Sequence, residues 1–109
     1  MNKLVLFLLL LFIAGCNSSA LIQVEPSKVC MVNDNFALEE QIPVKVNEKM
    51  YYGCCQGCVR KLNDDISYRT AIDPVSGKVV DKSQAIIGAE SSGKVYYFEN
   101  LNNLNNFQN

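Results

Sequence analysis

The chain has 109 residues, and its 10 Lys and Arg against 11 Asp and Glu give a net charge of −1. This balance argues against nucleic acid as a partner, because nucleic-acid-binding domains carry a basic surplus. The sequence contains 5 cysteines and no histidine, which excludes hydrolytic triads, Cys-His nucleophiles and every zinc or copper site built on imidazole. The cysteines are therefore the residues with chemistry to explain.

Residues 1–15 have the pattern of an export signal. One positive charge precedes an apolar run at residues 4–13, which is too short to cross a bilayer core of about 30 Å as a helix. The run ends in Ile13-Ala14-Gly15-Cys16, which resembles the bacterial lipobox, where small residues precede a cysteine that receives a diacylglycerol. We predict a lipoprotein signal peptide at residues 1–15 and lipidation at Cys16.

The lipid on Cys16 would make the membrane a partner, since each buried CH₂ of an acyl chain contributes about 0.8 kcal/mol to anchoring. Asn17 follows this cysteine, in place of the Asp that resembles an inner-membrane retention signal. We therefore expect a lipid-anchored protein of the bacterial cell envelope, on the periplasmic face of the outer membrane. Residues 16–27 are expected to be the lipidated cysteine and a mobile, extended tether, with the folded part beginning near Lys28.

The rest of the chain contains an internal repeat, in which residues 51–62 align with residues 96–107. Tyr52 and Tyr97 are expected to occupy equivalent places. Each copy is predicted to contain a knuckle-like turn (at Cys30 or Ser76), a strand (42–46 or 85–87), a second strand (49–53 or 94–98) and a short helix that begins near Cys55 or Asn100. The predicted fold class is α+β, a ββα unit that is duplicated, with a second copy that has no cysteines.

Three thiols are expected to converge in the first copy. If Cys54 ends a strand and Cys58 lies one helical turn later, both point to the same side of the strand-to-helix junction, and Cys30 arrives from the opening turn. A helix N-terminus favours thiolate, the form that binds soft metals. Three thiolates suit Cu(I), Zn(II) or a toxic heavy metal better than Mg²⁺ or Ca²⁺. Cys55 is either a fourth ligand or a cysteine that does not bind the ion.

These residues also carry a family resemblance. Cys30, followed by Tyr51-Tyr52-Gly53-Cys54-Cys55-Gln56-Gly57-Cys58, resembles the TRASH/YHS family of small treble-clef-like metal-binding domains. The segment Asp73-Pro74-Val75-Ser76-Gly77 with Tyr96-Tyr97-Phe98 is similar to the YHS opening Asp-Pro-Val-Cys-Gly and its Tyr-Tyr-Phe-Cys. The resemblance implies a treble-clef-like unit at residues 28–70 with metal ligands Cys30, Cys54 and Cys58, and a degenerate unit at residues 71–109.

The second copy has Ser76, Glu99 and Asn103 where the resemblance would place thiols. A soft-metal site is not expected there, and the few charges make tight Ca²⁺ binding through Glu99 and Asn103 improbable. We expect the second unit to be a structural partner. The resemblance implies capture, trafficking or sensing of metal ions, with an envelope metal transporter or resistance protein as the expected protein partner.

Three alternatives remain open for the cysteines. Exported proteins often pair an even number of cysteines in disulfides, although adjacent Cys54 and Cys55 would crowd both bonds into one turn. A zinc ion with a purely structural role is the second alternative. Thiol-redox activity through the single C-x-x-C of Cys55 and Cys58 is the least favoured, because no βαβ context accompanies it. We therefore expect a protein that is not an enzyme.

Overall fold

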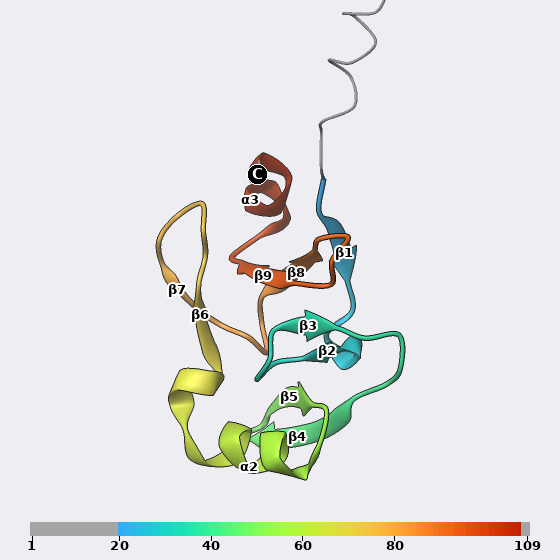
Figure 1. Cartoon of the computed structure of the whole chain (residues 1–109). Helices are drawn as coiled ribbons and strands as arrows, with labels where there is room; N and C mark the ends of the chain where they lie inside the picture. The colour runs from blue at the N-terminus through green and yellow to red at the C-terminus, as the bar shows by residue number, and fades with distance from the viewer. Residues whose placement is uncertain (1–19, 108–109) are drawn as a thin grey trace, which may run out of the picture.

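The computed structural model describes residues 20–107, which form a mixed α+β fold of small antiparallel sheets and short helices (Figure 1). The predicted fold class is confirmed. In chain order the elements are β1 (Ile22–Val24), the 3-10 helix η1 (Pro26–Lys28), β2 (Val29–Cys30), β3 (Asn35–Phe36), β4 (Ile42–Val46), β5 (Lys49–Gly53), α2 (Gln56–Asp64), the 3-10 helix η2 (Ile66–Tyr68), β6 (Thr70–Ile72), β7 (Val79–Asp81), β8 (Ile86–Ala89), β9 (Val95–Phe98) and α3 (Leu101–Asn106).

The element order repeats. A first unit consists of the knuckle hairpin β2–β3, the hairpin β4–β5 and helix α2, and a second unit consists of β6–β7, β8–β9 and α3. In Figure 1, α2 lies beside β4 and β5 at one end of the molecule, and α3 lies beside β8 and β9 at the other. The expected division between residues 70 and 71 falls within β6, which begins at Thr70.

The register of the two longer hairpins shows how closely the units correspond. The last residue of β5 pairs with the first of β4, and the last residue of β9 pairs with the first of β8. Tyr52 and Tyr97 therefore occupy equivalent positions, as predicted. The residue before each helix also has the same extended backbone, with φ and ψ of −158° and 173° at Cys55 and −156° and 171° at Asn100.

The knuckles correspond differently from the sequence alignment. The N–H of Asp34 donates to the carbonyl of Cys30 at 2.8 Å, and the N–H of Gly77 donates to that of Asp73 at 2.8 Å. Asp34 and Gly77 both have a positive φ, 56° and 77°, which closes each turn in the same way. The counterpart of Cys30 is therefore Asp73, and its expected pairing with Ser76 is wrong.

Asp73 joins the knuckle of the second unit to its helix. The residue is fully buried. Its Oδ1 accepts the N–H groups of Val75 and Ser76 at 2.7 and 3.1 Å, and its Oδ2 accepts the N–H of Glu99 at 2.8 Å and Nδ2 of Asn103 at 2.9 Å. Burial alone raises the pKa of Asp73, but the donated hydrogen bonds outweigh it and hold the pKa at about 2, below the usual 3.8.

The folded part begins earlier than expected. Residues 22–24, which were assigned to a mobile tether, form β1 and pair antiparallel with β8 to give the sheet order β1-β8-β9. Val24 packs against the core, whereas Ile22 is 68% exposed. Cys16, the predicted lipidation site, lies outside the described residues.

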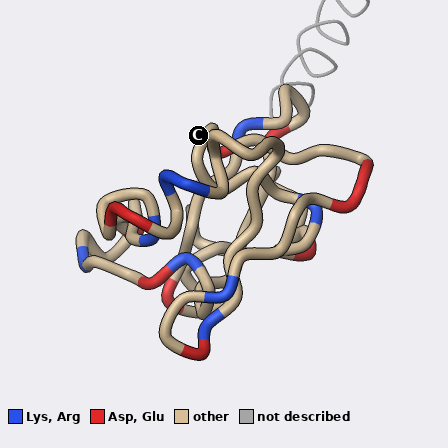
Figure 2. The backbone as a smooth tube through the Cα atoms, turned by 90° about the horizontal axis from the view of Figure 1, so that it is seen from below, with Lys and Arg blue, Asp and Glu red and all other residues tan. Residues whose placement is uncertain are grey.

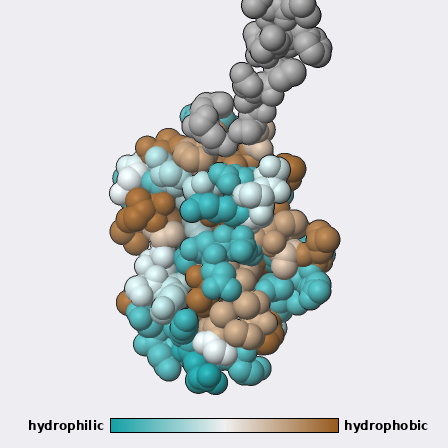
Figure 3. Space-filling view, in the orientation of Figure 1, coloured by the Kyte–Doolittle hydropathy of each residue, from teal (hydrophilic) through white to brown (hydrophobic). Residues whose placement is uncertain are grey.

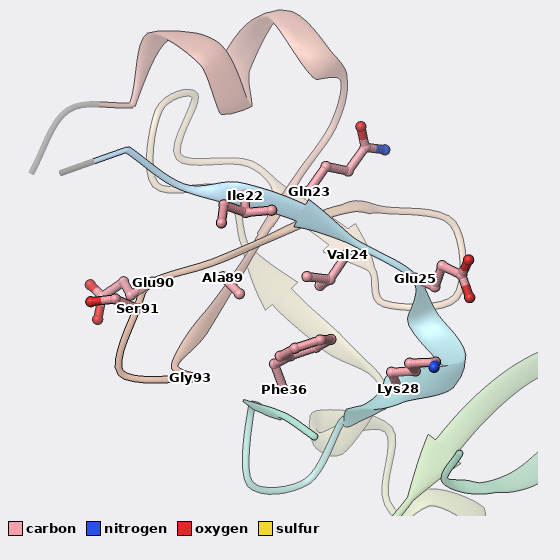
Figure 4. A pocket seen from close by; sticks show the side chains of 10 residues that line it. All are labelled: Ile22, Gln23, Val24, Glu25, Lys28, Phe36, Ala89, Glu90, Ser91 and Gly93. Atoms are coloured by element: carbon pink, nitrogen blue, oxygen red, sulfur yellow. The ribbon is translucent and has the colours of Figure 1, made fainter. Parts of the chain in front are cut away.

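Strand β1 also forms one wall of a groove of about 490 Å³. Figure 4 shows its lining residues, which come from β1, from Glu25 and Lys28 at the two ends of η1, from Phe36 of β3 and from the end of β8 with the turn that follows it. None of the four cysteines in the described part of the chain lines this groove.

One hydrophobic core joins the two units. Its buried residues come from both, namely Val29, Met31, Val44, Tyr51 and Leu62 from the first unit and Ile87, Ala89, Val95 and Tyr97 from the second. The hydrophobic side chains on the face shown in Figure 3 lie in patches separated by hydrophilic ones, and acidic and basic residues are interspersed along the chain in Figure 2. Within residues 20–107, no helix has the length and apolar character needed to cross a membrane.

We predict that Asp73→Asn lowers the free energy of unfolding at pH 7 by about 2 kcal/mol, because an amide cannot accept all four hydrogen bonds of the carboxylate. The folded-state pKa is depressed, so the contribution of Asp73 is complete above pH 4 and disappears as the pH falls toward 2. Denaturant unfolding at several pH values measures both effects. Asp65→Asn, at an exposed carboxylate, is the matched control, and equal stability of the two variants at pH 7 would contradict the role of Asp73.

Candidate metal centre

The sulfur atoms of Cys30, Cys54 and Cys58 lie together, all within 4.8 Å of one another. Cys58 is at the centre, since its Sγ is 3.8 Å from that of Cys30 and 3.6 Å from that of Cys54. The structure thus brings together the three cysteines that the sequence singled out as ligands.

Three elements bring these sulfurs to one point. Cys30 ends β2, Cys54 directly follows β5, and Cys58 lies in the first turn of α2. Between the last two, Gly53 permits close contact of strand and helix, because a Cβ at this position would lie 2.9 Å from the Cβ of Cys58. Cys30 and Cys58 are buried, whereas Cys54 is exposed, so the cluster has one face open to solvent.

The knuckle surrounds the sulfur of Cys30 with hydrogen-bond donors. Burial raises the pKa of this thiol, but the backbone N–H groups of Asn33 and Val32 and the thiol and N–H of Cys54 outweigh burial and lower the pKa. These donors parallel the N–H groups that Asp73 accepts two and three residues further along its own knuckle. The first knuckle therefore favours the anionic form of the Cys30 thiol.

The remaining thiols titrate as a group. Hydrogen bonds with the sulfurs of Cys30 and Cys58 raise the pKa of Cys54 to about 12. Burial, followed by the thiol of Cys55, raises the pKa of Cys58. The N–H of Cys58, its thiol and the N–H of Gly57 lower the pKa of Cys55. In the metal-free cluster, negative charge on some sulfurs therefore keeps the proton on others.

The spacing of the sulfurs fits a single metal ion. Thiolates bound at 2.3 Å to one tetrahedral ion lie ~3.8 Å apart, close to the observed 3.6 and 3.8 Å. Sulfurs joined in a disulfide lie only ~2.0 Å apart, and all four cysteines at residues 20–107 are free. A donor set of three thiolates suits Cu(I), Zn(II) or a thiophilic heavy metal.

Cys55 lies at the edge of this cluster. Its Sγ is 3.6 Å from that of Cys58, but it does not belong to the set of mutually close sulfurs. It is exposed and is the residue before α2, the position that Asn100 takes before α3. Asn100 caps its helix by accepting the N–H of Asn103.

The second unit replaces this sulfur cluster with hydrogen bonds. Glu99 and Asn103 stand at the positions of Cys54 and Cys58, and both donate to the carboxylate of Asp73, which stands at the position of Cys30. Because Asn103 directs its nitrogen to that carboxylate, its side chain is committed to the hydrogen bond. Ser76 contributes a backbone N–H to the same carboxylate.

Comparison with protein-family models, with curated protein sequences and with solved structures gives no match for this chain. The resemblance to the TRASH/YHS family stays a prediction.

The sequence analysis missed the roles of two buried charged residues. Asp73 and Lys82 are the buried charged residues of the described chain. The Asp-Pro-Val-Ser-Gly motif included Asp73, but it did not predict that this carboxylate would join the second knuckle to the start of α3. Lys82 gave no signal, since a lysine between Asp81 and Ser83 is typical of an exposed turn.

We predict that an alkylating reagent modifies the reduced, metal-free chain first at Cys55, which is exposed and has a lowered pKa, and last at the buried Cys30 and Cys58. Peptide mass spectrometry over a time course measures the order. Cys55→Ser is the control that removes the fastest phase, and fastest modification of Cys58 would contradict the geometry described.

Proposed function

We propose that this chain is a lipid-anchored cell-envelope protein that binds one soft or transition metal ion, Cu(I), Zn(II) or a toxic heavy metal, through Cys30, Cys54 and Cys58. The observation that carries the proposal is that these three sulfurs lie within 4.8 Å of one another, with Cys58 3.8 Å from Cys30 and 3.6 Å from Cys54, which suits thiolates that share one ion. Its role would be sequestration, trafficking or sensing of the ion. The resemblance to the TRASH/YHS family agrees with this function.

Two features favour a metal that is cargo over a metal that only stabilises the fold. The core is continuous across both units and includes residues of each, so it does not depend on the sulfur cluster alone. Cys54 and Cys55 are exposed, which gives an incoming or outgoing ligand access to the ion. A purely structural zinc would instead favour closed burial of all its ligands.

Proton release accompanies binding in this proposal. Each thiol must lose its proton before it can bind the ion, and the N–H groups of the knuckle favour this loss at Cys30. Affinity therefore falls as the pH is lowered and protons compete for the sulfurs. An envelope transporter or resistance protein that offers thiolates of its own is the kind of partner that would exchange the ion.

We predict that Cys54→Ser and Cys58→Ser each abolish tight binding of Cu(I) and Zn(II), whereas Cys55→Ser weakens it less. Removal of the central sulfur, Cys58, or of the open one, Cys54, leaves too few thiolates for the ion. Competition with a chromophoric chelator under reducing conditions measures the affinities. Equal losses in all three variants would contradict the ligand assignment.

The matched control is circular dichroism of each variant with and without chelator. The cargo role predicts that the metal-free chain keeps its folded spectrum. Unfolding of the unsubstituted chain when the chelator removes the metal would indicate a structural zinc instead.

We further predict that Cys16→Ser moves the protein from the membrane fraction to the soluble fraction of cells, because the acyl chains are lost. Fractionation followed by intact-mass measurement tests this prediction. An unsubstituted protein that carries no acyl mass would contradict the lipid anchor, while the metal-binding measurements would still stand.

A further inference from the structure

The ammonium group of Lys82 is buried where the two units meet. Lys82 directly follows β7 of the second unit and is 4% exposed. Its Nζ donates to the backbone oxygen of Met31 at 2.6 Å and to Oδ1 of Asp34 at 3.0 Å. It also lies 5.0 Å from the ring centroid of Tyr97. Lysine is rarely buried so deeply, and a neutral side chain would fill the space at a lower desolvation cost.

Both hydrogen-bond acceptors of Lys82 belong to the first knuckle. Met31 is the residue directly after Cys30, and Asp34 closes the turn with its positive φ. Val32 and Asn33 lie between these two residues. A cation that holds both ends of the turn restricts the backbone between them and the position of Cys30, which directly precedes Met31.

A second group from the same unit reinforces this arrangement. The hydroxyl of Tyr97 donates to Oδ1 of Asp34 at 2.8 Å, the atom that Lys82 also contacts. The carboxylate of Asp34 is therefore held by two donors of the second unit. The backbone N–H of the same residue closes the turn by donating to the carbonyl of Cys30 at 2.8 Å.

The second knuckle has a different arrangement. Gly77 stands at the position of Asp34 and has no side chain to be held, and Pro74 follows Asp73 as Met31 follows Cys30. The carboxylate of Asp73 itself secures that turn. The cation is thus a feature of the knuckle that carries a cysteine, and it is not part of the repeat.

We propose that Lys82 is a positioning residue of the metal centre, which holds Met31 and Asp34 so that the knuckle keeps the sulfur of Cys30 beside that of Cys58. The second unit is then part of the metal site although it supplies no sulfur. This inference rests on the proposed function, but the positioning itself can be measured without metal.

The test compares Lys82→Met with Lys49→Met in the full chain, purified in detergent under reducing conditions. Lys49 is the matched control, because its Nζ forms an ion pair with Oδ2 of Asp81 at 2.9 Å that also connects the two units but does not touch the knuckle. The affinity for Zn²⁺ is measured by chelator competition. Hydrogen exchange of the Val32 and Asn33 amides is measured by NMR in the metal-free protein.

We expect Lys82→Met to bind Zn²⁺ about 10- to 100-fold more weakly, the range for loss of a group that orients a metal ligand, and to exchange both knuckle amides faster. Lys49→Met should match the unsubstituted chain in both measurements. Lys82→Arg, which keeps the positive charge, should recover part of the affinity. Unchanged affinity and unchanged amide exchange in Lys82→Met would overturn the inference.

Asp34→Asn provides a variant that preserves the fold more closely, because Asn retains the side-chain oxygen and tolerates a positive φ. It should weaken Zn²⁺ binding in the same direction and by a smaller factor, and an unchanged affinity would count against the inference. If the unsubstituted chain binds neither Zn²⁺ nor Cu(I), the proposed function fails. The amide exchange of the metal-free variants then decides the positioning role by itself.

Discussion

In each unit of this fold, one bridge of polar or sulfur atoms joins the knuckle to the start of the helix. In the second unit the bridge is the buried carboxylate of Asp73, which accepts four hydrogen bonds from the knuckle and from the start of the helix. In the first unit the same place is occupied by the sulfurs of Cys30, Cys54 and Cys58. A carboxylate completes this bridge with hydrogen bonds, whereas three thiolates at one point repel one another, so the sulfurs either keep protons or share a cation.

This difference gives the two units different tasks. In the second unit, the carboxylate of Asp73 finds all its hydrogen-bond donors within the unit. This unit also supplies part of the core, contacts the first knuckle through Lys82 and pairs its strand β8 with β1. The first unit keeps an open face at Cys54 and a nearby free thiol at Cys55. The proposed cargo role would use this difference, because the exposed Cys54 gives an ion access to the cluster while the second unit packs in the shared core.

Local patterns in the sequence were sufficient for much of this architecture. The tyrosine pairs and the spacing of Cys54 and Cys58 located both longer hairpins, both helices and the convergence of the sulfurs. The equivalence of Cys30 and Asp73 could not be predicted, because it depends on a backbone hydrogen bond that closes each turn and not on similar side chains. The strand at residues 22–24 was missed since its partner β8 is distant in the sequence.

X-ray absorption spectroscopy at the metal edge of the loaded protein tests the central claim most directly. The account predicts one ion per chain with a sulfur shell of at least three atoms at about 2.3 Å when the ion is zinc. A shell of oxygen or nitrogen alone, or an ion count near zero after loading under reducing conditions, would contradict the sulfur-bridged first unit on which the account depends.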